Sequence, residues 1–82
     1  MLEEKKYILK LINNINKGNS VSVPSIDMRV MRKYPSVIYE DNLKIYLLEL
    51  EEEGYIELLD EITLKITQKG IIFLKYENQE NF

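Results

Sequence analysis

The stretch LLELEEEGYIELLDEITLKITQKG, residues 47–70, decides the fold because the spacing of its apolar residues changes at Gly54. Before Gly54 they recur every three or four residues, which is the period of an amphipathic helix. After Gly54 they alternate with polar residues, first over 55–58 and again over 62–66, as in half-buried strands. The stretch therefore predicts a helix that ends at Gly54 and is followed by a β-hairpin.

The loop of this hairpin sets its register. A two-residue loop would place Leu58 opposite Thr63, and apolar side chains would then share a face with polar ones. A three-residue loop, 59–61, keeps the apolar residues together on the inner face. We therefore expect four opposed pairs, namely Leu58 with Ile62, Ile56 with Leu64, Glu57 with Thr63, and Tyr55 with Lys65.

On the N-terminal side, residues 3–16 predict an amphipathic helix. Its apolar face consists of Ile8, Leu11, Ile12 and Ile15. Residues 17–20, Lys-Gly-Asn-Ser, end this helix, because Gly and Asn suit the left-handed position of a C-terminal cap. Residues 21–23 are short and β-branched, which fits either a brief strand or a loop packed on the core.

Two prolines divide the part of the chain that follows. Pro24 suits the first turn of a helix, which predicts a second helix over about 24–33. Pro35 keeps the preceding residue from helical angles, and Ser36 can then cap a third helix over about 37–53. The turn of about three residues between these two helices is the spacing of a helix-turn-helix.

The C-terminal part predicts one more helix. Thr67 caps it, and it extends to about Tyr76, after which the chain is expected to fray. We expect a single domain over residues 1–77 and a frayed tail over 78–82.

The composition excludes most catalytic chemistry. The chain has no Cys and no His, so disulfides, thiolate nucleophiles, imidazole bases and the usual zinc sites are absent. Consecutive acids such as Glu51, Glu52 and Glu53 point in different directions and form a solvated helix end. We expect no enzymatic activity, no cofactor and no metal. No apolar run approaches the roughly 20 residues of a membrane span, and the N-terminus lacks a signal-peptide core, so a cytoplasmic protein is expected.

Charge is divided along the chain, although the net charge is only -3. Residues 17–36 hold four cations against Asp27, whereas residues 37–61 hold nine carboxylates against Lys44. Any surface that binds an anion must therefore be built from the first half of the chain.

Two segments carry a family resemblance. Residues 47–56 look like the join of recognition helix and first wing strand in MarR-like and PadR-like regulators, and LKITQKG, residues 64–70, resembles the LT-x-KG stretch that closes their wing. Residues 8–20 are also similar to the start of YjcQ-like small winged-helix proteins. The resemblance implies the winged helix-turn-helix fold, an α+β domain with three helices, a two-stranded β-hairpin wing and a C-terminal helix.

The resemblance also implies DNA binding, with the third helix in the major groove and the wing near phosphates. A cluster of cations, namely Arg29, Arg32 and Lys33, includes both arginines of the chain. The planar guanidinium group of arginine suits hydrogen bonding to phosphate and to guanine. The three residues form either a phosphate-binding cluster or a solvated helix face. Acids at the start of the third helix and in the hairpin loop oppose the usual pose. The residues expected to contact DNA are Arg29, Arg32, Lys33, Ser36, Tyr39, Lys44, Lys65 and, as a stripe along the first helix, Lys6, Lys10 and Lys17.

The last helix is apolar nearly all round, which indicates either burial by the rest of the chain or a second copy. The residues expected at a homodimer interface are Ile71, Ile72, Phe73, Leu74 and Tyr76. We expect a small protein that binds double-stranded DNA, as a transcriptional regulator or an accessory factor of a phage or plasmid. The alternative is a protein-interaction module that uses its acidic surface against a basic protein partner and does not bind DNA.

Overall fold

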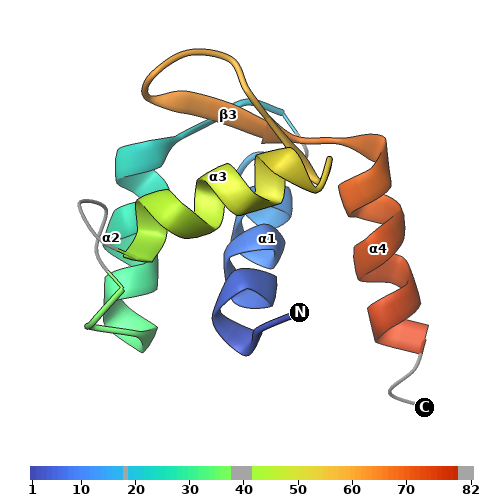
Figure 1. The fold of residues 1–82 in the computed structure, drawn as a ribbon, viewed down its shortest axis with the longest axis horizontal. Helices are drawn as coiled ribbons and strands as arrows, with labels where there is room; N and C mark the ends of the chain where they lie inside the picture. The colour runs from blue at the N-terminus through green and yellow to red at the C-terminus, as the bar shows by residue number, and fades with distance from the viewer. Residues whose placement is uncertain (18, 38–41, 80–82) are drawn as a thin grey trace.

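The computed structural model describes residues 1–17, 19–37 and 42–79. These residues form four α-helices and a small antiparallel sheet of three strands, which confirms the predicted α+β class (Figure 1). In chain order the elements are α1 (Glu3–Ile15), β1 (Val21–Ser22), α2 (Val23–Lys33), α3 (Lys44–Glu52), β2 (Ile56–Leu58), β3 (Thr63–Ile66) and α4 (Gln68–Gln79). Among the described residues, no helix has the length and apolar content needed to cross a membrane.

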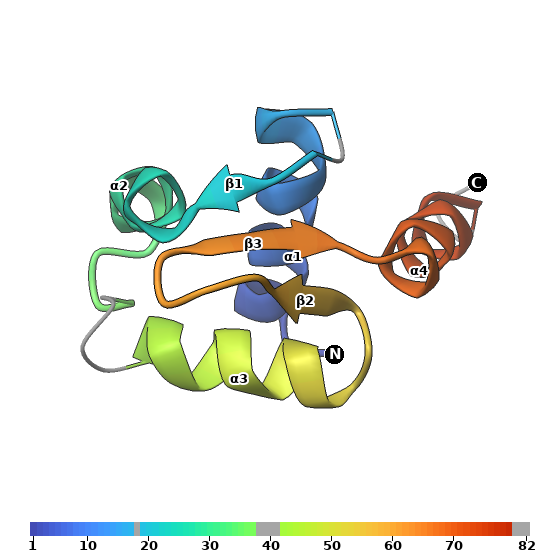
Figure 2. The same ribbon diagram turned by 90° about the horizontal axis from the view of Figure 1, so that it is seen from above.

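The order of strands determines which helices are neighbours. β3 lies in the centre of the sheet, with β1 and β2 at opposite edges. α2 continues directly from β1, and α3 packs beside β2. Seen from above, the sheet separates α3 from the last turns of α1 (Figure 2). The second and third helices are therefore positioned at different edges of the molecule.

One apolar core joins these elements. Its buried residues come from every helix and strand, and the fully buried side chains include Ile12 of α1, Ile26 of α2, Leu50 of α3 and Leu64 of β3. The charged side chains are left on the surface, because no polar or charged residue among those described is fully buried. Since the core is shared, the helices hold fixed positions and their exposed faces are well defined.

The predicted second helix is confirmed. Ser22 precedes it, and its Oγ accepts a hydrogen bond from the Ser25 backbone N–H at 3.4 Å. Pro24 occupies the first turn, where its missing N–H has no cost. The helix ends at Lys33, so Arg32 and Lys33 lie in its last turn, where cations interact favourably with the helix dipole.

The predicted first helix is also confirmed, although its C-terminal cap differs in detail. α1 ends at Ile15, and the left-handed residue after it is Lys17, with φ of 52°. The expected Gly18 lies outside the described residues. A side chain at this conformation crowds the following carbonyl oxygen, so the position stores backbone strain.

We expect Lys17→Gly to raise the free energy of unfolding by about 0.5–1 kcal/mol, because glycine relieves this strain at some cost in unfolded-chain entropy. Urea denaturation followed by circular dichroism measures the change. Lys10→Gly is the matched control, since it removes the same charge from a helical position and is expected to lower stability by about 1 kcal/mol. Equal losses in both variants would show that Lys17 is unstrained in solution.

The predicted third helix is described only in part, because residues 38–41 lie outside the described residues. Val37 is not helical: it is buried, and its N–H donates to the Tyr34 carbonyl at 2.9 Å, which closes a β-turn with Pro35 at its favoured second position. Ser36 lies in this turn, and the N–H groups that it is predicted to cap belong to residues outside the described part of the chain. α2 ends at Lys33 and the described α3 comprises Lys44–Glu52, so the separation of about three residues stays a prediction that depends on residues 38–41.

The predicted register of the hairpin is wrong by two residues. Ile56 pairs with Ile66, Glu57 with Lys65, and Leu58 with Leu64. The loop is again three residues long but comprises 60–62, because the Leu59 N–H donates to the Thr63 carbonyl at 2.9 Å. A shift of two residues preserves the faces of both strands, so the apolar side chains still point inward.

Two hydrogen bonds explain this choice of loop. The Asp60 carboxylate accepts from the Ile62 N–H at 2.9 Å and so forms the turn itself. The Ile62 carbonyl accepts from the Val23 N–H at 2.7 Å, which attaches the loop to the start of α2. Ile62 is consequently 61% exposed and does not serve as a core residue.

The predicted two-stranded wing also gains a third strand. Val21 pairs with Leu64 and Ser22 with Thr63. Residues 21–22, for which the sequence allowed either a strand or a loop, therefore form β1. Thr67 caps the last helix as predicted: its Oγ1 accepts from the Gly70 N–H at 3.1 Å. α4 continues to Gln79, which is further than the predicted end near Tyr76.

Candidate nucleic-acid interface

Three cations on α2 are exposed, and two of them lie on its α1 side. The Lys33 Nζ is 4.6 Å from the centre of the Tyr7 ring on α1 and 5.7 Å from that of Tyr34. The two rings meet edge to face at 5.6 Å. Lys33 therefore lies over the seam between the helices, held by cation–π attraction. Arg29, one turn earlier, is on the same side of α2.

α1 adds Lys10 to this surface. Lys10 is exposed and projects from the side of α1 opposite the buried Ile8 and Ile12. It follows Tyr7 by three residues, so it lies one turn from the Lys33 contact. We define the α1–α2 cationic face as Lys10, Arg29 and Lys33, together with Arg32, which follows Arg29 by three residues and is therefore its neighbour on the surface of α2.

Few of the protein's own acids offset this face. Among the described residues none of its four cations takes part in an ion pair. The Arg29 Nη1 donates to the Ser25 carbonyl at 3.2 Å, which leaves its other donors available. Asp27, the one acid of α2, is half-buried and two residues from Arg29, so it points to the other side of the helix.

The predicted stripe along the first helix is only partly present. Lys6 forms an ion pair with Glu77 of α4 at 3.0 Å. Lys17 lies beyond the end of α1, so helical spacing does not place it in line with Lys10. Lys10 is the member of the stripe that joins the α1–α2 cationic face.

Of the remaining predicted DNA contacts, Lys44 and Lys65 are not brought to this face. Ser36 is exposed in the turn after α2, and Tyr39 lies outside the described residues. Lys44 is on α3, where it lines a hollow with Asp60 and Glu61. Lys65 projects from the outer face of the sheet, opposite Glu57.

The acids at the end of α3 are compensated by lysines from other elements. Lys5 of α1, with its side chain only 11% exposed, pairs with Glu53 at 2.7 Å and Glu49 at 3.4 Å. Burial lowers the pKa of Lys5, but the hydrogen bond to Glu53 and the charges of both glutamates outweigh it, so the pKa is raised. Lys69 donates to the Glu53 carbonyl at 2.7 Å and so caps the helix.

A second contact joins α1 to α3. The Tyr46 hydroxyl donates to Glu4 Oε2 at 2.7 Å, and this hydrogen bond, with burial, raises the pKa of Tyr46. These contacts fix the N-terminal turns of α1 against α3. The exposed side of α1 is therefore left to α2 and its cations.

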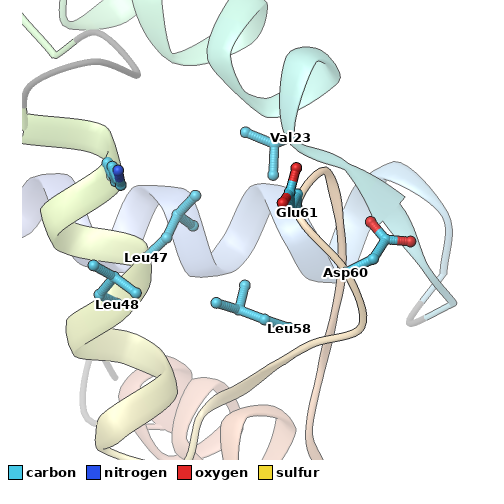
Figure 3. Close-up of a pocket in the computed structure, with 7 residues that line it drawn as sticks. Val23, Leu47, Leu48, Leu58, Asp60 and Glu61 are labelled. Carbon is cyan, nitrogen blue, oxygen red and sulfur yellow. The ribbon is translucent and has the colours of Figure 1, made fainter.

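A hollow of about 410 Å³ lies between α3 and the hairpin (Figure 3). It is lined by Val23, Lys44, Leu47, Leu48, Leu58, Asp60 and Glu61, and we name it the α3–hairpin groove. The hydrogen bond from the Ile62 N–H lowers the pKa of Asp60, so this carboxylate is charged at neutral pH. The sequence did not reveal this groove, because it depends on how α3 packs against β2. Its one signal in the sequence was Leu48, an apolar residue of α3 that is 49% exposed.

The residues predicted for a dimer interface are divided by the structure. Leu74 is 5% exposed and belongs to the protein's own core, so its assignment to an interface is wrong. Phe73 packs on Tyr55 with ring centres 4.9 Å apart, and Ile71 is also partly covered. Ile72 and Tyr76 are exposed. A homodimer through α4 stays a prediction that would rest on these two side chains.

The part of the chain that the structure describes contains no group of acidic side chains arranged to hold a metal ion. Comparisons of the chain with protein-family models, with curated proteins and with solved structures found no match.

Proposed function

We propose that this chain is a winged-helix protein that binds double-stranded DNA through its α1–α2 cationic face. The order of its elements supports the fold assignment: a helix, a short strand, two helices, a hairpin and a final helix, with the first strand paired to the second hairpin strand. Fold alone does not fix function, so the assignment of DNA binding rests on the distribution of charge.

The observation that carries the proposal is the separation of cations from acids. α2, which carries three of the four cations, continues from β1 at one edge of the sheet, whereas α3 and its glutamates pack beside β2 at the other edge. The hairpin loop beside α3 is also acidic, with Asp60 and Glu61. Carboxylates repel phosphates, so a pose with α3 in the major groove is disfavoured and the opposite face is favoured.

The mechanism is non-covalent. Lys10, Arg29, Arg32 and Lys33 neutralise phosphates and release counterions, and Arg29 and Arg32 have forks that match phosphate oxygens. Four contacts predict a slope of about -3.6 in a plot of log K against log salt. So small a footprint gives modest affinity, suited to an accessory factor or to a regulator that binds as a dimer.

Arg29→Ala with Arg32→Ala is expected to weaken binding to an AT-rich duplex about tenfold and to reduce the salt slope to about half, since two of the four contacts are lost. Fluorescence anisotropy of a labelled duplex, titrated from about 50 to 200 mM salt, measures both quantities. Arg29 and Arg32 are exposed and in no ion pair among the described residues, so stability should change little.

Lys65→Ala with Lys75→Ala is the matched control. These lysines are exposed on β3 and α4, and removing them lowers the net charge by the same amount. The slope should stay within experimental error of the natural protein. Equal effects in both double variants would show that binding follows net charge and not this face. Absence of binding at about 50 mM salt and micromolar protein would contradict DNA binding altogether.

A further inference from the structure

The α3–hairpin groove is an apolar hollow that α3 and the hairpin form together with Val23 at the start of α2. Leu47 and Leu48 of α3 face Val23 and Glu61 across it, with Leu58 of the hairpin between them (Figure 3). Leu47 and Val23 are buried, whereas Leu48 is 49% exposed. Its volume lies within the range of about 300–1,000 Å³ that is typical of binding pockets.

The rim of the groove is acidic. Asp60 and Glu61 form its hairpin side, and Lys44 is the one cation among the lining residues. Glu51 is adjacent, because its Oε2 accepts from the Leu58 N–H at 3.2 Å. Glu52 follows Leu48 by one helical turn and is exposed. The groove therefore combines an apolar floor with a negative edge.

The apolar surface continues beyond the groove. Ile45, on the next turn of α3 from Leu48, is 50% exposed, and Leu59 and Ile62 flank the acidic residues of the hairpin loop. Exposed apolar side chains that adjoin a groove and are bordered by charges are typical of protein-binding surfaces.

We propose that the α3–hairpin groove binds a cationic amphipathic segment of a protein partner. One or two apolar side chains of that segment would pack against Leu47, Leu48 and Leu58. Its Lys or Arg side chains would lie at Asp60, Glu61 and Glu51. An amphipathic helix in a groove is an established mode of peptide recognition. The proposal goes beyond DNA binding, which uses the other edge of the sheet.

Charge complementarity selects this partner over the alternatives. A nucleic acid would bring phosphates to four carboxylates, and an acidic peptide would do the same. A purely polar cationic peptide would leave Leu48 and Ile45 exposed. The groove thus requires both properties in one segment, an apolar stripe and positive charge.

The test uses three labelled peptides of about 14 residues, titrated with the full chain and followed by fluorescence anisotropy. One is an amphipathic helix of Leu and Lys, the second replaces each Lys by Glu, and the third replaces each Leu by Ser. We expect the first to bind at micromolar concentration and the other two to bind at least about tenfold more weakly.

Variants in the groove and a control variant on α4 test whether the peptide binds in the groove. Leu48→Lys puts a cation into the groove and is expected to weaken the first peptide about tenfold or more. Ile72→Lys makes the same charge change at an Ile that is 43% exposed on α4, and it should leave binding unchanged. Asp60→Asn retains an oxygen that accepts from Ile62 but removes the charge. Together with Glu61→Gln it should weaken binding of the first peptide several-fold and reduce the salt dependence of that binding.

Three results would overturn the proposal. They are no binding of the Leu/Lys peptide, equal binding to the natural protein and Leu48→Lys, and equal binding of the peptide that lacks Leu. Displacement of the peptide by duplex DNA, with weaker DNA binding by Leu48→Glu, would assign the groove to nucleic acid instead. The result is independent of the α1–α2 cationic face, because Arg29→Ala with Arg32→Ala should leave peptide affinity unchanged.

Discussion

Gly70→Ala is expected to lower the free energy of unfolding by about 2 kcal/mol, although alanine is the better helix former. Gly70 is buried in the first turn of α4. A Cβ at this position would overlap the Tyr55 carbonyl oxygen and would lie 2.7 Å from Ile66 Cγ1. The gain in helix propensity is about 1 kcal/mol, whereas a clash with backbone costs about 3 kcal/mol, because a carbonyl cannot rotate away.

Chemical denaturation with urea measures this loss, with the slope m reporting whether the fold is retained. Gln68→Ala is the control, since Gln68 is exposed in the same turn and its replacement should change stability by less than about 0.5 kcal/mol. If Gly70→Ala does not fold in buffer, the variant and the natural protein are compared in the presence of a stabilising osmolyte. Full stability of Gly70→Ala would mean that α4 and Tyr55 separate without cost.

The contacts around Gly70 explain why a threonine and a glycine occur three residues apart in the stretch LKITQKG, residues 64–70. The Thr67 N–H donates to the Tyr55 carbonyl at 2.9 Å, and the Thr67 hydroxyl donates to the Gly54 carbonyl at 2.6 Å while it accepts from Gly70. One threonine thus caps α4 and ties it to the strand after α3. A glycine three residues later allows this close approach.

Local patterns predicted the elements whose determinants are local. The helix around Ile8 and Ile12, the proline-started α2 and the end of α3 at Gly54 depend on periodicity and caps within a few residues. Val37 was misassigned because two local signals compete here, a helix cap at Ser36 and a β-turn around Pro35, and burial of Val37 in the core favours the turn. The register of the hairpin was missed because Ile62 is held by the backbone of Val23, far away in sequence.

The same distinction applies to the candidate sites. Arg29 and Lys33 are one turn apart, so the sequence predicted their common side. It did not predict that this side faces α1, nor that Lys6 pairs with Glu77, because both depend on how helices pack. The separation of α2 from α3 follows from β1, a strand of two residues that sequence alone left undecided.

Reversal of two charges on α2 should have the largest effect on function. Arg29→Glu with Arg32→Glu removes two phosphate contacts and adds two repulsive ones, and we expect DNA affinity at about 50 mM salt to fall at least about 100-fold. Both side chains are exposed, so folding should be retained. Anisotropy gives the affinity, and circular dichroism checks the fold.

A four-residue variant separates the position of the charges from their sum. Adding Glu52→Lys and Glu61→Lys to the reversed protein restores the net charge of -3, but on the α3 and hairpin side. If DNA binds the α1–α2 cationic face, this variant should bind as weakly as the reversed protein, because the new lysines lie at the other edge of the sheet. Recovered affinity would instead show that DNA lies against α3 and the hairpin. Since electrostatic attraction acts over about 10 Å at moderate salt, only a charge within reach of the bound phosphates contributes.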